Sequence, residues 1–332
     1  MEICISRPNA PMSLSNIIRA AVIQTCTAAY SLPDTLSKLE HFTKLAREDG
    51  AQLAVFPEAF IGGYPKMSTF GTVIGMRTLE GRNEFLRYYN AAVEIPSPSI
   101  SRIEELSTAN NMYLIVGVIE REGGTLYCTV IFVDPAKGYV GKHRKLMPTA
   151  TERLVWGAGD ASTLPVLEKT FEHRIETEQT SRGSVKAKIS AAICWENYMP
   201  LLRTFYYSEG TQIYCAPTVD ARPEWQHTMT HIAIEGRCFV LSACQFSREK
   251  DYPPDHPVAD INNRNPENIM VGGGSVIISP LGEVLAGPLF HREGILTANL
   301  NLDDVIRGKF DLDVVGHYSR PDVFQFRVSD AF

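Results

Sequence analysis

The chain has 332 residues, of which 44% are hydrophobic and 21% are charged. This ordinary globular composition excludes a disordered protein, and no apolar run is long enough to span a bilayer. The net charge of -6, with both signs mixed along the chain, provides no basic surface for nucleic acid or an anionic membrane. We therefore expect a protein that acts on a small molecule.

Short apolar runs alternate with helical patterns, which is typical of a layered α/β fold. In the first half, strands are expected at 17–25, 52–56, 112–119 and 128–133. Ser31 and Ser97 begin two predicted helices, and Asp34 completes a capping pattern with Ser31. The chain then turns back into the basic stretch 141–145.

In the second half, strands are expected at 188–193, 212–216, 238–242, 274–278, 284–286 and 295–300. Two helices are expected among them, one from about Pro200 and one over 225–233. Two polar segments are interpreted as surface loops, a protruding hairpin loop at 172–186 and a loop rich in Pro, Asp and Asn at 250–267.

The domain organisation is expected to be simple, because no low-complexity linker or internal repeat divides the chain. We expect a poorly ordered N-terminal extension over 1–16, a single domain over 17–328 and a short tail over 329–332. The seven cysteines show no C-x-x-C spacing, so neither a zinc site nor a disulfide ladder is indicated. Most lie in apolar runs and no signal peptide is evident, which predicts a cytoplasmic protein.

Three residues with complementary chemistry each follow a predicted strand, namely Glu58, Lys145 and Cys194. Strand ends are where functional side chains converge in α/β folds. A nucleophilic thiol needs a base to accept its proton and a cation to stabilise developing negative charge. Each residue alone has another interpretation: a buried core cysteine, a carboxylate at a helix start, and a solvated lysine. The spacing of these residues along the chain does not decide between a catalytic role and these alternatives.

The segments around these residues form three motifs: FPEAFIGGYP at 56–65, GKHRKLMPT at 141–149 and AICWENYMP at 192–200. Further blocks include CAPT at 215–218 and SACQF at 242–246. On these motifs the chain resembles the nitrilase branch of the carbon–nitrogen hydrolase superfamily over 17–328, and plant-type nitrilases in particular. The Cys-Trp-Glu-Asn form favours nitrilases over the superfamily's amidases.

The resemblance implies a mechanism that converts a nitrile and water to a carboxylic acid and ammonia. Cys194 would attack the nitrile carbon to form a thioimidate, and then a thioester, while Glu58 acts as general base. Lys145 would stabilise the developing negative charge, and Glu152 matches the family's second glutamate, which supports the lysine and the water.

Three aromatic residues near these motifs are expected to bind substrate, although buried aromatic residues more often belong to the core. They are Tyr64, Trp195 and Tyr198. No cofactor and no metal are expected. A hydratase that yields the amide, an amidase with the same three residues, and a non-catalytic assembly protein remain as alternatives.

The resemblance also implies a four-layer αββα sandwich that dimerises into an eight-layer assembly through helices around 199–209 and 224–236. Family members often build spirals or filaments from such dimers, so a homo-oligomer is expected, with neither nucleic acid nor a membrane as partner. The chain departs from the plant-type pattern in a longer segment at 171–186, in Ala158 and in the loop 250–268. These departures bear on substrate range and assembly.

Overall fold

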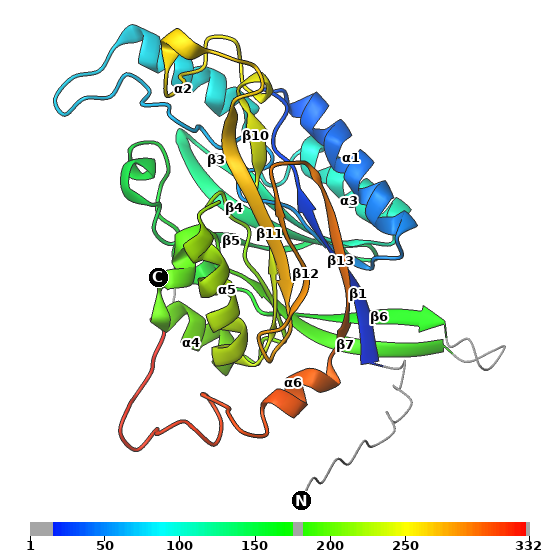
Figure 1. Cartoon of the computed structure of the whole chain (residues 1–332). Coiled ribbons are helices and arrows are strands. Elements are labelled where there is room, and N and C mark those ends of the chain that lie inside the picture. Colours follow the sequence, from blue (N-terminus) through cyan, green and yellow to red (C-terminus); the bar gives the residue numbers. More distant parts are fainter. Residues whose placement is uncertain (1–15, 175–181, 330–332) are drawn as a thin grey trace, which may run out of the picture.

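The computed structural model describes residues 16–174 and 182–329 of the chain (Figure 1). The expected N-terminal extension lies outside these residues apart from Asn16, and the expected tail lies outside them apart from Ser329. The middle of the expected hairpin loop, 175–181, is also outside the described residues. The single-domain assignment stays a prediction.

A six-stranded sheet forms one half of the structure, with the strand order β13-β1-β2-β3-β4-β5. Its strands are β1 (Ile17–Gln24), β2 (Leu53–Val55), β3 (Tyr113–Glu122), β4 (Thr125–Asp134), β5 (Gly138–Arg144) and β13 (Gly294–Asn301). The strands β1, β2 and β3 run parallel, and antiparallel strands flank them on both sides. The short central strand β2 is fully buried, as expected for a parallel strand covered on both faces.

A seven-stranded sheet forms the other half, with the order β10-β11-β9-β8-β7-β6 and β12 paired to β11. Its strands are β6 (Leu167–Arg174), β7 (Arg182–Ala191), β8 (Ile213–Cys215), β9 (Phe239–Ser242), β10 (Phe246–Arg248), β11 (Ile269–Ile278) and β12 (Val284–Phe290). Again three parallel strands, β7, β8 and β9, lie between antiparallel neighbours.

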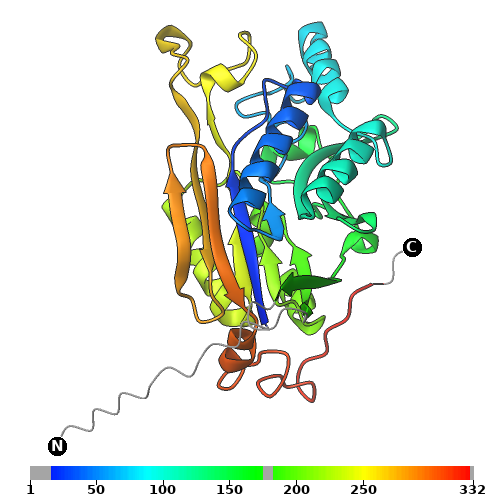
Figure 2. The same cartoon turned by 90° about the vertical axis from the view of Figure 1, so that its right-hand side faces the viewer.

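Helices cover the outer face of each sheet and complete four layers (Figures 1 and 2). The helices are α1 (Leu32–Glu48), α2 (Leu79–Ala91), α3 (Pro98–Asn110), α4 (Pro200–Ser208), α5 (Pro223–Gly236) and α6 (Asp303–Gly308). In Figure 1, α1 and α3 flank the six-stranded sheet, whereas α4 and α5 flank the seven-stranded sheet. The expected αββα sandwich is confirmed.

The period of two along each strand explains the layers, because neighbouring side chains point to opposite faces of a sheet. In β1, Val22 joins the core between the two sheets, while Ile23 joins the core beneath α1 and α3. In β8, Ile213 faces the core between the sheets and Tyr214 faces α4 and α5. The molecule therefore has three stacked apolar layers.

Most expected elements are present, with differences that have local causes. The end of β6 and the start of β7 extend into the polar segment 172–186, which was expected to be a loop. There the ladder between the two strands pairs Glu172 with Ser184. The helix α2 was not expected, since its Leu79 and Leu86 are exposed and form no buried stripe. Within the loop expected at 250–267, a short 3₁₀ turn forms at Ile261–Asn263.

A close backbone crossing holds the segment that follows β2. A Cβ atom on Gly117 of β3 would lie 2.0 Å from the carbonyl oxygen of Pro57 and 2.8 Å from the Cα of Glu58. The chain is then fixed on β3 by a hydrogen bond from Ile61 N–H to the Gly117 carbonyl at 3.0 Å. Only glycine permits this approach, so Gly117 determines where Glu58 lies.

We expect Gly117→Ala to lower the free energy of unfolding by about 1–3 kcal/mol, the usual effect of forcing a methyl group into a packed site. The substitution should also displace Glu58. Chemical denaturation and a crystal structure of the variant would measure both effects. Gly124→Ala is the control, because a Cβ there meets no atom within 4 Å. Equal stability of the two variants would contradict the prediction.

Candidate active site

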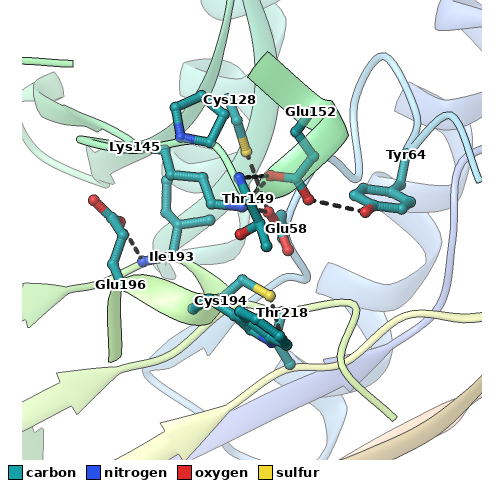
Figure 3. Close-up of polar contacts among 12 residues, drawn as sticks. Glu58, Tyr64, Cys128, Lys145, Thr149, Glu152, Ile193, Cys194, Glu196 and Thr218 are labelled. Carbon is teal, nitrogen blue, oxygen red and sulfur yellow. Dashed lines mark hydrogen bonds and ion pairs between the residues drawn. The ribbon is translucent and has the colours of Figure 1, made fainter. Parts of the chain in front are cut away.

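Three chain segments meet at one end of the two sheets, and Figure 3 shows their side chains converging. Glu58 follows β2 and Lys145 follows β5, both in the six-stranded sheet. Cys194 follows β7 in the seven-stranded sheet. The three residues expected from their positions after strands therefore come together, although they are drawn from two different sheets.

Lys145 is the centre of the polar contacts. Its ammonium lies 2.7 Å from Glu58 Oε1 and 2.8 Å from Glu152 Oε2, and its side chain is 0% exposed. Burial lowers the pKa of Lys145, but the negative charge of Glu58 and its other neighbours outweighs burial and holds that pKa well above its ordinary value. The lysine therefore stays protonated although its side chain is fully buried.

Glu58 has one carboxylate oxygen engaged and one available. Oε1 binds Lys145 and accepts a weak hydrogen bond from the Cys128 thiol at 3.5 Å, whereas Oε2 has no partner among the described residues. Gln245 donates from Nε2 to the main-chain oxygen of Glu58 at 2.7 Å, which fixes the backbone from the other sheet. Burial raises the pKa of Glu58, and the charge of Lys145 opposes that rise.

Cys194 occupies a sharp turn directly after its strand. Its backbone has φ of 52°, in the left-handed region that non-glycine residues rarely adopt. Thr218 donates a hydrogen bond from Oγ1 to the sulfur at 3.2 Å. Burial raises the pKa of the thiol, and the charge of Glu58 raises it further, so the sulfur keeps its proton until a base removes it.

Glu152 lies in the 3₁₀ turn Ala150–Leu154 and accepts several donors besides the lysine. The backbone N–H of Thr149 binds Oε2 at 2.6 Å, and the hydroxyl of Tyr64 binds Oε1 at 2.9 Å. Tyr64 is therefore tied to the charged cluster, as Figure 3 shows. Burial and then the charge of Glu152 raise the pKa of Tyr64, so its hydroxyl remains a donor.

A cavity of about 370 Å³ opens over the sulfur. Its lining includes Tyr64, Glu152, Cys194 and Trp195, which places two of the three expected aromatic residues against it. An adjoining cavity of about 410 Å³ shares Tyr64 and Glu152 and has several apolar residues on its wall. That wall includes Met67, Phe70, Leu154 and Val155.

Tyr198 is placed differently from Trp195. It is absent from the cavity lining, and its ring packs edge-on against Trp195 at 5.8 Å and Trp225 at 6.1 Å between ring centroids. Trp195 and Tyr198 belong to the same 3₁₀ turn, Cys194–Tyr198, in which side chains three residues apart stack on one face. Tyr198 therefore supports Trp195 from outside the cavity.

Several residues near the site were not singled out from the sequence, although the quoted motif blocks contain some of them. Thr218 ends the block CAPT and Gln245 lies in SACQF. Asp220 was missed altogether; it accepts a hydrogen bond from Trp195 Nε1 at 2.9 Å and pairs with Arg222 at 2.6 Å. Long-range contacts of this kind have no periodic signal in the sequence.

Neither a cluster of metal-ligating side chains nor a membrane-spanning helix is found among the described residues. No group of three or more His, Cys, Asp or Glu side chains gathers there as a metal site would require. The helices within 16–174 and 182–329 are all too short or too polar to cross a membrane.

Comparison with known proteins identifies the family. The sequence matches the carbon-nitrogen hydrolase family over residues 19–310. An arylacetonitrilase of Trametes versicolor is 69% identical over 96% of this chain and 98% of its own length. A bifunctional nitrilase/nitrile hydratase of Nicotiana tabacum is 51% identical, over 94% of this chain and 86% of its own length. Nitrilase 2 of Arabidopsis thaliana is 50% identical over 95% and 90%, respectively.

Among solved structures, an amidase from Nesterenkonia sp. has the same fold, with a TM-score of 0.62 at 19% identity over 90% of this chain and 96% of the amidase. The expected resemblance to the nitrilase branch, plant enzymes included, is confirmed by these relatives. The order of the strands, the four layers and the sequence relatives agree, and the chain belongs to the carbon–nitrogen hydrolase family.

Proposed function

We propose that this protein is a nitrilase that hydrolyses an arylacetonitrile to the carboxylic acid and ammonia. The observation that carries the proposal is the buried convergence of a thiol, a carboxylate and an ammonium under a cavity. The identity of 69% to an arylacetonitrilase supports the choice of substrate class. Tyr64 and Trp195 are proposed to contact the substrate, since aromatic rings favour stacking on an aryl group.

In the first step, Glu58 takes the proton of the Cys194 thiol, and the sulfur attacks the nitrile carbon. The available Oε2 of Glu58 is the proposed acceptor. Negative charge develops on the nitrile nitrogen beside the Lys145 ammonium, which stabilises it. The nitrogen then receives the proton, so that one thiol and one nitrile give one thioimidate.

In the second step, Glu58 takes a proton from a water molecule that adds to the thioimidate carbon. Glu58 returns this proton to the departing nitrogen, so the tetrahedral species loses ammonia and leaves a thioester on Cys194. A second water then releases the acid and restores the thiol. Glu152 is proposed to hold Lys145 and the water in place, because it bonds the lysine at 2.8 Å. Two water molecules are consumed for each ammonia released.

A second outcome of the same intermediate is release of the amide. If the carbon–sulfur bond breaks before the carbon–nitrogen bond, the products are amide and free thiol, without ammonia. The 51% identity to a bifunctional nitrilase/nitrile hydratase favours some amide formation. Amidase action on the same residues is the remaining alternative.

The proposal extends to assembly and location. We propose a homodimer formed through α4 and α5, and a higher spiral or filament built from such dimers. Support comes from Leu201 and Ile234, which are exposed apolar residues on these helices. A cytoplasmic location is proposed because the six described cysteines are free and buried, which suits a reducing compartment.

We expect the purified protein to release ammonia and acid in equal amounts from phenylacetonitrile, and to act more slowly on benzonitrile and on short aliphatic nitriles. Quantifying ammonia, acid and amide together distinguishes the outcomes. Cys194→Ala is the control and should abolish all products. Mostly amide would favour the hydratase outcome, and unchanged turnover by the variant would refute the assigned nucleophile.

We expect Glu152→Gln to move the acidic limb of the pH profile of kcat/KM to lower pH. Activity requires ionised Glu58 and is lost as the pH falls through its pKa. Burial raises that pKa, Lys145 lowers it, and the charge of Glu152 raises it. Removing the Glu152 charge therefore lowers the pKa of Glu58.

The plateau rate of Glu152→Gln should also fall, roughly 10- to 100-fold, because Lys145 is less well oriented. Glu122→Gln is the matched control, since it removes an exposed carboxylate that pairs with Arg144 at 3.1 Å. Its profile should coincide with that of the wild type. An acidic limb that stays in place or moves to higher pH in Glu152→Gln would contradict the assigned roles.

A further inference from the structure

The reacting groups come from two sheets that share no ladder of strand pairing within the described residues. Lys145 and Glu58 belong to the six-stranded sheet, and Cys194 belongs to the seven-stranded sheet. The core between the sheets is apolar, and apolar contacts have no directionality. Directional bonds across the interface are therefore needed to set the position of Lys145 relative to Cys194.

The carboxylate of Glu196 makes such bonds. Its Oε1 accepts the backbone N–H of Leu146 at 2.6 Å, and its Oε2 accepts the backbone N–H of Ile193 at 2.8 Å. Leu146 directly follows Lys145, and Ile193 directly precedes Cys194. One carboxylate thus holds the neighbours of both reacting residues, and Figure 3 shows Glu196 reaching Ile193.

His143 holds this carboxylate from the strand β5. Its Nε2 lies 2.9 Å from Glu196 Oε2, and its Nδ1 lies 2.7 Å from the carbonyl oxygen of Thr163. Because a carbonyl only accepts, Nδ1 must donate, and the carboxylate accepts from Nε2. Burial lowers the pKa of His143, but the charge of Glu196 outweighs burial and raises it. The pair is therefore an imidazolium and a carboxylate, both fully buried.

Local capping of the turn does not account for these contacts. A hydrogen bond from the Ile193 N–H to Glu196 alone would cap the 3₁₀ turn Cys194–Tyr198. The bonds to Leu146 and His143, however, reach the other sheet. A buried ion pair seldom adds net stability over apolar residues, whereas it does fix a specific arrangement.

We propose that Glu196, anchored by His143, is a positioning residue that sets the placement of Lys145 relative to Cys194 across the interface between the two sheets. This inference rests on the proposed function, because it assumes the roles given to those two residues. Glu196 itself is fully buried, so it acts through its neighbours and not on the substrate.

The test is Glu196→Gln, whose amide offers one accepting oxygen and one donating nitrogen. One of the two backbone N–H groups must then face a donor, and His143 loses its counter-charge. We expect kcat to fall roughly 10- to 100-fold with KM changed less than about twofold, since only the alignment of reacting groups is affected.

Alkylation of Cys194 by iodoacetamide gives a second readout that requires no nitrile turnover. The charge of Lys145 lowers the pKa of the Cys194 thiol against burial and Glu58, which both raise it. If Lys145 moves away, that pKa rises, so the pH profile of the alkylation rate should shift to higher pH in Glu196→Gln. A loss of stability alone would not produce this shift.

Asp134→Asn is the matched control. The Asp134 carboxylate also accepts two backbone N–H groups, at 2.8 and 3.2 Å, and pairs at 2.8 Å with Lys169 of the other sheet. It lies at the end of β4 away from Cys128, roughly 20 Å along the strand. Its variant should lose stability but keep the kcat and the alkylation profile of the wild type.

Should Glu196→Gln fail to fold, His143→Gln removes the buried charge and keeps Glu196, and it should show a smaller shift in the same direction. An unchanged kcat and alkylation profile in a folded variant would overturn the proposal, as would an equal effect in Asp134→Asn. If the wild type turned over no nitrile, the proposed function would fail, while the alkylation profiles would still decide the positioning role.

Discussion

The buried ammonium of Lys145 is the constraint on which the rest of the site depends. Removing a charge from water costs several kcal/mol, so the protein must supply partners of opposite charge. Glu58 and Glu152 do so from 87 and 7 residues away along the chain. The close crossing at Gly117 and the 3₁₀ turn that carries Glu152 are both conditions for this arrangement.

Two carboxylates around one ammonium also explain how similar groups acquire different tasks. Glu152 is held by the lysine, a backbone N–H and Tyr64, and its side chain is 11% exposed. Glu58 is fully buried and keeps one oxygen available for a proton. Burial, and then the negative charge of Glu58, raise the pKa of the Cys194 thiol and keep it protonated at rest, so reactivity appears only when substrate and base are both aligned.

Much of the fold and the central residues could be predicted from the sequence, because period-two apolar runs and strand ends are local signals. Glu58, Lys145 and Cys194 were found in this way, with the motifs resolving their alternatives. The contacts of Glu196 could not be predicted, since the register of two packed sheets is a tertiary property without local periodicity. Tyr198 was assigned to the pocket from its nearness in sequence, but the 3₁₀ turn directs it behind Trp195.

The wall of the second cavity, which adjoins the one over the sulfur, is built differently from the reacting site. The three reacting residues lie within three positions of the ends of β2, β5 and β7, whereas Met67, Phe70 and Leu154 of that wall lie in longer connecting segments. Such segments tolerate substitution far better than sheet interiors do. Substitutions in this wall can therefore change the range of nitriles that the enzyme accepts, while the residues that break the carbon–nitrogen bond stay the same.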